Sequence, residues 1–207
     1  LQGLQEGIKG SQVKITKIET YTATDATVDS QMSSLSTTRA DILYLAVVPK
    51  FAAGAVNHAF TLGWRPTVYL PSVSSSISQV VNPGRLGGYP ELYTTSFVKR
   101  ADDPQWVNDP AIQDMTTQMK KYAPDANPAT LNSPFTYAAA VAFVEALKSM
   151  KSTGRKDLMN ALNTLKTSDI GLLLPGITID GTDQKHPPVT GLKLEHFQNG
   201  SWSNIDK

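Results

Sequence analysis

One stretch of the sequence, residues 41–76, constrains the fold more than any other. Its first part, residues 41–48, is almost continuously apolar, as expected for a strand that is covered on both faces. Pro49 ends that strand and suits the first turn of a helix, in which apolar residues recur at helical spacing from Phe51 onward. A second short strand, Thr67–Leu70, follows. The pattern predicts a β-α-β unit with two parallel strands.

Two loops of this unit are candidate ligand sites. In open parallel sheets, ligands bind beyond the carboxyl ends of the strands. The loops that leave these ends are residues 48–51 and residues 71–76. Backbone N–H groups at the start of a helix can hold a carboxylate, and an aromatic ring can cover an apolar ligand. We therefore expect these two loops to form part of a ligand rim.

The composition excludes several classes of function. The chain has 207 residues, of which 40% are hydrophobic, so it can bury a core in one large or two small domains. Its formal net charge of +1 provides no field that would attract nucleic acid or an anionic membrane, and we expect no nucleic-acid partner. The chain has no cysteine, which excludes disulfides, thiolate catalysis and cysteine metal sites. No apolar run approaches the ~20 residues that span a bilayer.

The rest of the chain continues as an α/β protein and then changes character. The first part predicts a helix that ends near Gly10, a strand at residues 13–18, a helix at 28–38 and, after the central unit, a strand at 92–98. Two long helices follow, at residues 110–122 and 135–150, and the second is so apolar that we expect deep burial. A third helix is predicted at 155–165. Asn199-Gly200 predicts the turn of a C-terminal hairpin. This order predicts a three-layer fold around a parallel sheet.

The sequence shows no arrangement that supports catalysis or metal binding. The histidines are not spaced as metal ligands, and no nucleophile is paired with a base. The run of serines at residues 74–76 lacks the glycines of a nucleophile elbow. The glycine-rich segment 84–88 does not follow a strand directly, as a phosphate-binding loop would. We therefore predict no catalytic residue, no metal and no cofactor.

Five short motifs, spread over nearly the whole chain, carry a family resemblance. They are residues 24–31, residues 49–53 together with 62–67, residues 103–106, residues 137–140 and residues 173–177. Each motif is a weak signal alone, but the five occur in the same order as in one known family. Together they resemble the branched-chain amino-acid-type periplasmic binding proteins of ABC transporters, which have the type I two-lobe fold. The resemblance implies a solute-binding protein outside the cytoplasm, with a small-molecule solute and a membrane permease as partners.

The resemblance also implies a division into lobes. Proteins of this family are about twice as long and cross between their lobes three times. This chain resembles the part that begins at the first helix of the second lobe. Residues 1–96 and 168–207 would then form the second lobe, and residues 97–167 the helical part of the first. The signal peptide and the first half of the chain would precede the sequence.

The family pattern suggests which residues line the cleft. Pro49, Lys50 and Phe51 lie at the helix start that faces the cleft in the family, although Phe51 could equally be a core residue. Further candidates are the rim residues Ser72 and Ser74, whose hydroxyls could instead make local backbone bonds, the rim residue Tyr21, and Phe135 and Tyr137 on the apolar helix.

The chemistry of the second rim loop restricts the ligand. Amino-acid-specific members of the family carry a carboxylate for the ligand's ammonium near the position of Ser72, whereas residues 71–76 contain no acid. An unpaired buried ammonium would be costly. We therefore expect a carboxylate or an aromatic acid, with a branched-chain-type amino acid as the alternative.

Two other functions are compatible with the same fold. A ligand-sensing ectodomain is the first alternative, and a cofactor-free enzyme is the second, because a fold alone does not decide function. The two long helices also predict an exposed apolar surface if the first lobe's sheet is missing. We therefore expect residues 104–150 to pair with a second copy of the chain as a homodimer.

Overall fold

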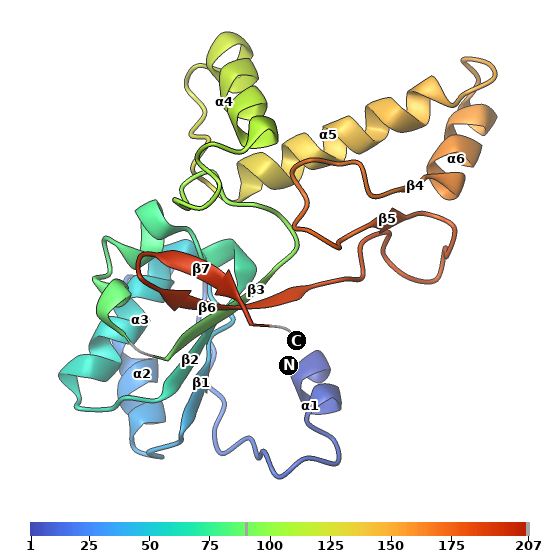
Figure 1. Cartoon of the computed structure of the whole chain (residues 1–207). Coiled ribbons are helices and arrows are strands. Elements are labelled where there is room, and N and C mark those ends of the chain that lie inside the picture. The colour runs from blue at the N-terminus through green and yellow to red at the C-terminus, as the bar shows by residue number, and fades with distance from the viewer. Residues whose placement is uncertain (90, 206–207) are drawn as a thin grey trace.

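The computed structural model describes residues 1–89 and 91–205, and a five-stranded sheet forms its centre (Figure 1). The strand order is β1-β2-β3-β6-β7. The strands β1 (Ile42–Tyr44), β2 (Thr67–Leu70) and β3 (Leu92–Ser96) pair in parallel. Strand β6 (Lys193–Gln198) pairs antiparallel with β3, and β7 (Ser201–Asn204) pairs antiparallel with β6. The predicted α/β fold with a mainly parallel sheet is therefore confirmed.

One face of this sheet is covered by two helices, α2 (Asp29–Ser36) and α3 (Pro49–Thr61) (Figure 1). Pro49 stands at the first turn of α3, and the buried residues of this helix share one core cluster with Val68 of β2 and Leu92 of β3. Three short helical turns, Ser72–Ser74, Ile77–Val81 and Leu86–Gly88, complete the layer. The core between sheet and helices is closed: Ala55, Val56, Val68, Val80 and Leu92 have no exposed surface.

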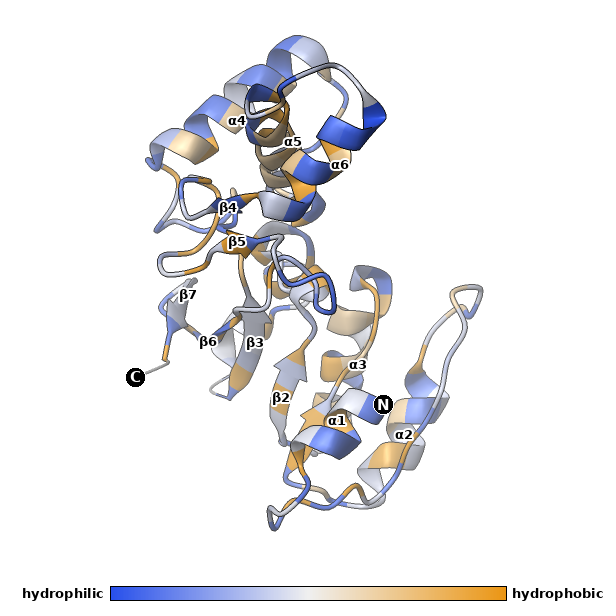
Figure 2. Ribbon diagram, turned by 90° about the vertical axis from the view of Figure 1, so that its right-hand side faces the viewer, coloured by the Kyte–Doolittle hydropathy of each residue, from blue (hydrophilic) through white to orange (hydrophobic). Residues whose placement is uncertain are grey.

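The other face of the sheet is partly uncovered. Ile42 and Tyr44 of β1 are 45% and 54% exposed. The short helix α1 (Gln2–Gly7) lies opposite this face in both ribbon views, but it buries none of its residues (Figures 1 and 2). The predicted strand at residues 13–18 is wrong. In the described part of the chain no backbone hydrogen bond joins this segment to β1, and an alternating pattern forms a strand only beside a partner.

The helical part of the chain comprises α4 (Pro110–Tyr122), α5 (Asn132–Lys148) and α6 (Arg155–Thr164), with a small sheet of β4 (Lys166–Thr167) and β5 (Ile179–Asp180). All three helices were predicted within three residues of their observed ends. Asp109 accepts hydrogen bonds from the backbone N–H groups of Ala111 and Ile112 and so caps α4.

The predicted deep burial of the apolar helix is wrong. The buried residues of α5 are Pro134, Ala138, Ala142 and Ala146, which form one stripe. Phe143, Val144 and Leu147 are each more than 40% exposed. A helix that is apolar all round is covered only where it has neighbours, and α5 has them on one side.

The chain passes twice between the sheet and the helical part. Residues 97–99 run beside residues 172–174, joined by Lys99 N–H to Leu172 C=O and Leu174 N–H to Phe97 C=O. Residues 170–179 contribute Ile170, Leu172 and Ile177 to the core of the helical part. Residues 168–205 therefore pack with both regions. The last two residues of the expected lobe segment 168–207 lie outside the described part. The division into lobes stays an expectation.

The C-terminal hairpin forms at its predicted turn. Asn199 and Gly200 both have positive φ, 52° and 83°, as a two-residue turn between twisted strands requires. Gln198 and Ser201 pair across the turn. The hairpin brings Trp202 into the core, where none of its surface is exposed.

Candidate ligand-binding site

The two predicted rim loops meet at the carboxyl edge of the parallel strands. Tyr44 pairs with Tyr69, so β1 and β2 end side by side. Beyond the strands, the Ser74 hydroxyl donates to the backbone carbonyl of Val47 at 2.6 Å. This buried bond ties the loop after β2 to the loop after β1. The two loops therefore form one continuous rim, and its role in ligand binding stays a prediction.

Tyr21 joins this rim from a distant part of the sequence. Its hydroxyl accepts a hydrogen bond of 3.0 Å from the backbone N–H of Val48. Its ring meets the ring of Phe51 edge to face, with 5.0 Å between centroids. The structure thus brings Tyr21 together with the start of α3, where the sequence predicted both to contribute.

The predicted site residues of the rim divide into interior and surface positions. Phe51 is 3% exposed and packs in the core. Ser74 has no exposed surface, and its hydroxyl bonds to Val47 of the other loop. Pro49, Ser72 and Tyr21 are half-buried, and Lys50 is exposed. Ligand contact by any of these residues stays a prediction. The half-buried and exposed residues could contact a ligand without rearrangement, whereas Phe51 and Ser74 could not.

Lys50 is the cation of the rim. Its ammonium donates to the backbone carbonyl of Asp25 at 2.9 Å and lies 4.6 Å from the centre of the Phe51 ring. The Asp25 carboxylate accepts hydrogen bonds from the backbone N–H and the hydroxyl of Thr22, which lower its pKa from the ordinary value. Lys50 and an ionised Asp25 therefore stand close together at this edge.

Two apolar residues of the rim were not singled out from the sequence. Val48 and Val73 are 43% and 47% exposed, one on each rim loop. Both fall inside the loops that the β-α-β pattern identified, but no sequence signal separates an exposed valine from a buried one there. Together they give the rim an apolar surface beside the Lys50 charge.

Phe135 lies at the start of α5 and remains 47% exposed. Its ring packs edge to face against Phe97, 5.8 Å between centroids, on the segment that leaves β3. It therefore stands beside the crossing between the two regions. Its predicted place at the border of an inter-lobe cleft stays a prediction.

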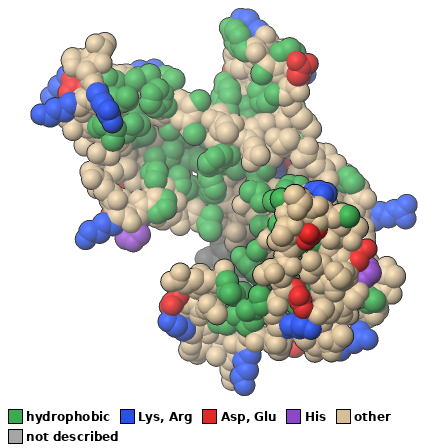
Figure 3. Space-filling model, turned by 180° about the vertical axis from the view of Figure 1, so that it is seen from behind, with side chains coloured by type: hydrophobic (Ala, Val, Ile, Leu, Met, Phe, Trp, Pro, Cys, Tyr) green, Lys and Arg blue, Asp and Glu red, His purple; other side chains and the backbone are tan. Residues whose placement is uncertain are grey.

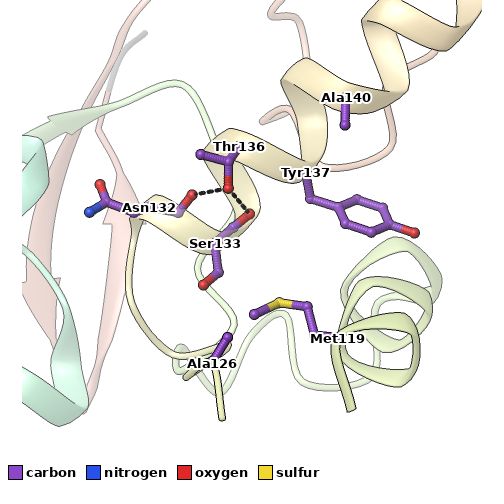
Figure 4. A pocket seen from close by; sticks show the side chains of 7 residues that line it. All are labelled: Met119, Ala126, Asn132, Ser133, Thr136, Tyr137 and Ala140. Atoms are coloured by element: carbon purple, nitrogen blue, oxygen red, sulfur yellow. Dashed lines mark hydrogen bonds between the residues drawn. The ribbon is translucent and has the colours of Figure 1, made fainter. Parts of the chain in front are cut away.

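Tyr137 faces a different groove. Its hydroxyl donates to the Asp114 carboxylate at 2.9 Å, and its ring points toward α4 (Figure 4). It lines an open hollow of about 350 Å³ between α4 and α5, with Met119, Ala126, Asn132, Ser133, Thr136 and Ala140. Burial raises the pKa of Tyr137, and the bond to Asp114 adds to this. The structure does not bring Tyr137 to the rim formed by the two loops.

The surface of the helical part is apolar beyond this groove. Seen from behind, hydrophobic side chains gather over the α5–α6 part of the molecule (Figure 3). The exposed apolar residues of these helices include Phe143, Val144, Leu147 and Met159.

The described residues contain neither a metal-ligand cluster nor a membrane-spanning helix. No group of three or more histidine, aspartate or glutamate side chains there could hold a metal ion. No helix among the described residues has both the length and the apolar character needed to cross a membrane.

Comparison with solved structures shows the same fold in a set of longer proteins. A branched-chain amino-acid ABC transporter protein from Thermus thermophilus with bound valine is 13% identical, with a TM-score of 0.77, and the match covers 98% of this chain and 55% of that one. A substrate-binding periplasmic protein from Ralstonia solanacearum is 18% identical, with a TM-score of 0.77 and coverage of 98% and 56%. A fatty acid ABC transporter substrate-binding protein from Thermomonospora curvata is 19% identical, with a TM-score of 0.65 and coverage of 88% and 46%.

The chain thus spans about half the length of these solved relatives. No curated protein matches it. The sequence pattern of one family, periplasmic binding protein, matches residues 2–198, which is nearly the whole chain. This match agrees with the mainly parallel sheet and with the rim at its carboxyl edge, and the chain belongs to the periplasmic binding protein family.

Proposed function

We propose that this chain is part of the extracytoplasmic solute-binding component of an ABC importer. The observation that carries the proposal is the family match over residues 2–198, combined with a rim of two joined loops at the carboxyl edge of β1 and β2. Closure of two lobes about the crossing segments would bury a small molecule, and a membrane permease would recognise the closed form. The family supports a place of action outside the cytoplasm.

The rim chemistry favours a ligand that carries a carboxylate and an apolar or aromatic body. Lys50 supplies an exposed cation, Val48 and Val73 supply apolar surface, and the loop of residues 71–76 has no acid. A carboxylate gains from a charge-assisted hydrogen bond to an ammonium. Aromatic acids are therefore the first ligand class to test.

A branched-chain-type amino acid is the second candidate, and Asp25 is the observation in its favour. This carboxylate is held ionised by its bonds from Thr22, so it could pair with the ligand's ammonium. A sensing ectodomain of the same fold would bind its ligand through the same rim. A cofactor-free enzyme is the least supported reading, because the family consists of binding proteins.

A binding screen tests the function. The protein in its full natural length is screened by thermal shift against aromatic acids, fatty acids and L-leucine, because this chain spans only about half of its solved relatives. A ligand at a hundred times its Kd stabilises the protein by about 2.7 kcal/mol, a readily measured shift. Submicromolar binding of L-leucine without any response to aromatic acids would refute the preferred ligand class. The absence of any binding would refute the function.

Lys50→Met tests the role of the rim cation. We expect the Kd of a carboxylate ligand to rise at least tenfold, since hydrogen bonds to charged groups contribute about 1.5–3 kcal/mol. Stability should change little because Lys50 is exposed. Lys120→Met, at an exposed position on α4, is the matched control and should bind as the unaltered protein does. Equal affinity in the two variants would remove Lys50 from the site.

A further inference from the structure

Arg100 is a charged residue in the interior of the protein. It lies on the segment of residues 97–109, which carries the chain from β3 to α4 (Figure 1), and it is 1% exposed. Its guanidinium stands 2.7 Å from the carboxylate of Glu195 on β6, which is 2% exposed. The guanidinium also lies over the ring of Trp202, 5.2 Å from the ring centre. A buried ion pair of this kind contributes little net stability, because the cost of desolvation offsets the attraction between the charges.

The third contact of Arg100 reaches the ligand rim. Its Nε donates to the hydroxyl of Ser75 at 3.0 Å, in a buried bond. Ser75 belongs to the loop of residues 71–76 and is itself fully buried. Its hydroxyl donates in turn to the carbonyl of Ser72, and its own carbonyl accepts from the indole N–H of Trp202 at 2.9 Å. Arg100 therefore holds the inner side of the same loop whose outer side carries Ser72 and Val73.

Two neighbours of Arg100 strengthen this attachment. Asp102 accepts from the Ser76 hydroxyl at 2.7 Å and from the backbone N–H of Ser78 at 2.8 Å. Asp103, which has no exposed surface, accepts from the Ser201 hydroxyl at 2.5 Å and from the backbone N–H of Trp202 at 3.0 Å. The segment between the two regions is thus bonded both to the rim loop and to the hairpin. A movement of this segment cannot leave the loop in place without breaking these bonds.

We propose that Arg100 is a positioning residue that fixes the rim loop of residues 71–76 through Ser75, and so sets ligand affinity without touching the ligand. The inference rests on the proposed function, in which that loop borders the cleft. Glu195 and Trp202 orient the guanidinium, and the planar fork of arginine directs Nε to Ser75 while Nη1 lies beside the Glu195 carboxylate. A lysine keeps the charge but cannot reproduce this geometry.

The test begins with a measurement that needs no ligand. Amide hydrogen exchange is followed at Ser74 and Ser75, whose N–H groups bond to Pro71 and Ser72 within the loop. We expect Ser75→Ala and Arg100→Lys to speed exchange at these two amides about tenfold, because local opening becomes easier. Lys99→Met is the matched control. It breaks the neighbouring ion pair to Asp109 at the start of α4 and should leave the loop amides unchanged. Unchanged loop exchange in both test variants, or an equal change in the control, would overturn the positioning role.

The second measurement connects the loop to binding. Benzoate and L-leucine are titrated into the full-length protein and its variants. We expect Ser75→Ala to weaken binding of the preferred probe three- to tenfold and to lower the ligand-free Tm by a few degrees, because the buried Arg100 Nε loses its acceptor. Affinity is therefore compared at a temperature at which both proteins are folded, and Lys99→Met should bind normally. Equal affinity of Ser75→Ala and the unaltered protein, despite a loosened loop, would overturn the effect on binding. If the unaltered protein binds neither probe nor any ligand of the screen, the proposed function fails, while the exchange measurement still decides the role of Arg100.

Discussion

The sheet part and the helical part of this chain cover their apolar side chains to different degrees. Between the sheet and its helix layer, Val56, Val68, Val80 and Trp202 have no exposed surface. In the helical part Met115 is fully buried, yet Phe143 and Leu147 of α5 are 43% and 42% exposed. The two parts have similar kinds of residues but different numbers of neighbours.

The difference shows what a sheet contributes to packing. A sheet presents several strands on one broad face, so two helices laid on it share their core with all of them. The helices α4, α5 and α6 have only short chain segments and each other, and the small sheet β4–β5 pairs two residues from each strand. A core of this size leaves helix faces without a partner. We therefore expect the helical part, more than the sheet part, to need a partner surface that covers its exposed apolar side chains.

The largest expected effect comes from truncating the best-buried side chain of the sheet part. Trp202→Ala removes a fully buried ring and its hydrogen bond to Ser75, and we expect a loss of about 3–5 kcal/mol in urea unfolding. Phe143→Ala on α5 is the contrasting variant and should change the stability by about 0.5 kcal/mol or less. Similar losses in the two variants would mean that the difference in coverage has no energetic consequence.

Hydrogen exchange measures the same contrast without substitution. The amides of α3, which is packed against the sheet, should exchange about a hundredfold more slowly than those of α6, whose only buried residue is Ala161. Residue-resolved exchange by NMR gives both rates in one sample. Equal protection in the two helices would show that both regions open as one unit.

Association tests whether the exposed helix faces matter. At roughly 25 cal/mol per Å², covering apolar helix faces is enough to drive assembly, so we expect the 207-residue chain to form dimers through residues 104–150. Val144→Glu, at a position 45% exposed, should weaken this dimer at least tenfold in light scattering. The same change at Val13, 48% exposed but outside the helical part, is the control. A monomer at high concentration would contradict the dimer and show that the exposed faces need no partner.

The smallest effect concerns the ion pair that supports the short sheet of the helical part. Lys166 lies 2.7 Å from Asp180 and, with the hydroxyl and N–H of Thr182, lowers the pKa of this carboxyl from 3.8 to about 2. Because the pKa is lowered in the folded state, the stabilising contribution is present above about pH 4 and is lost as the pH falls toward 2. Lys166→Met should raise the pKa of Asp180 part of the way toward 3.8, as measured by NMR titration. An unchanged pKa would assign the whole shift to Thr182.

Local signals in the sequence determined most of the elements. The helix α4 begins at Pro110, a residue suited to the first turn, and Asp109 directly before it supplies the capping side chain. The hairpin turn at Asn199-Gly200 needs only two residues that tolerate positive φ. The position of the rim loops could also be predicted from the sequence of β1 and β2, because the carboxyl ends of adjacent parallel strands meet at one edge.

The tertiary structure alone decided which side chains face inward and which segments find a partner. Residues 13–18 alternate as a strand should, but no strand lies beside them within the described chain. Phe51 and Ser74 sit in predicted rim loops, yet both face inward, where Phe51 packs in the core and against Tyr21 and Ser74 bonds to Val47. Arg100 meets Glu195 across a separation of nearly the whole second half of the chain. Such contacts depend on where the folded chain brings distant residues together, and the periodicity of a single segment carries no information about that.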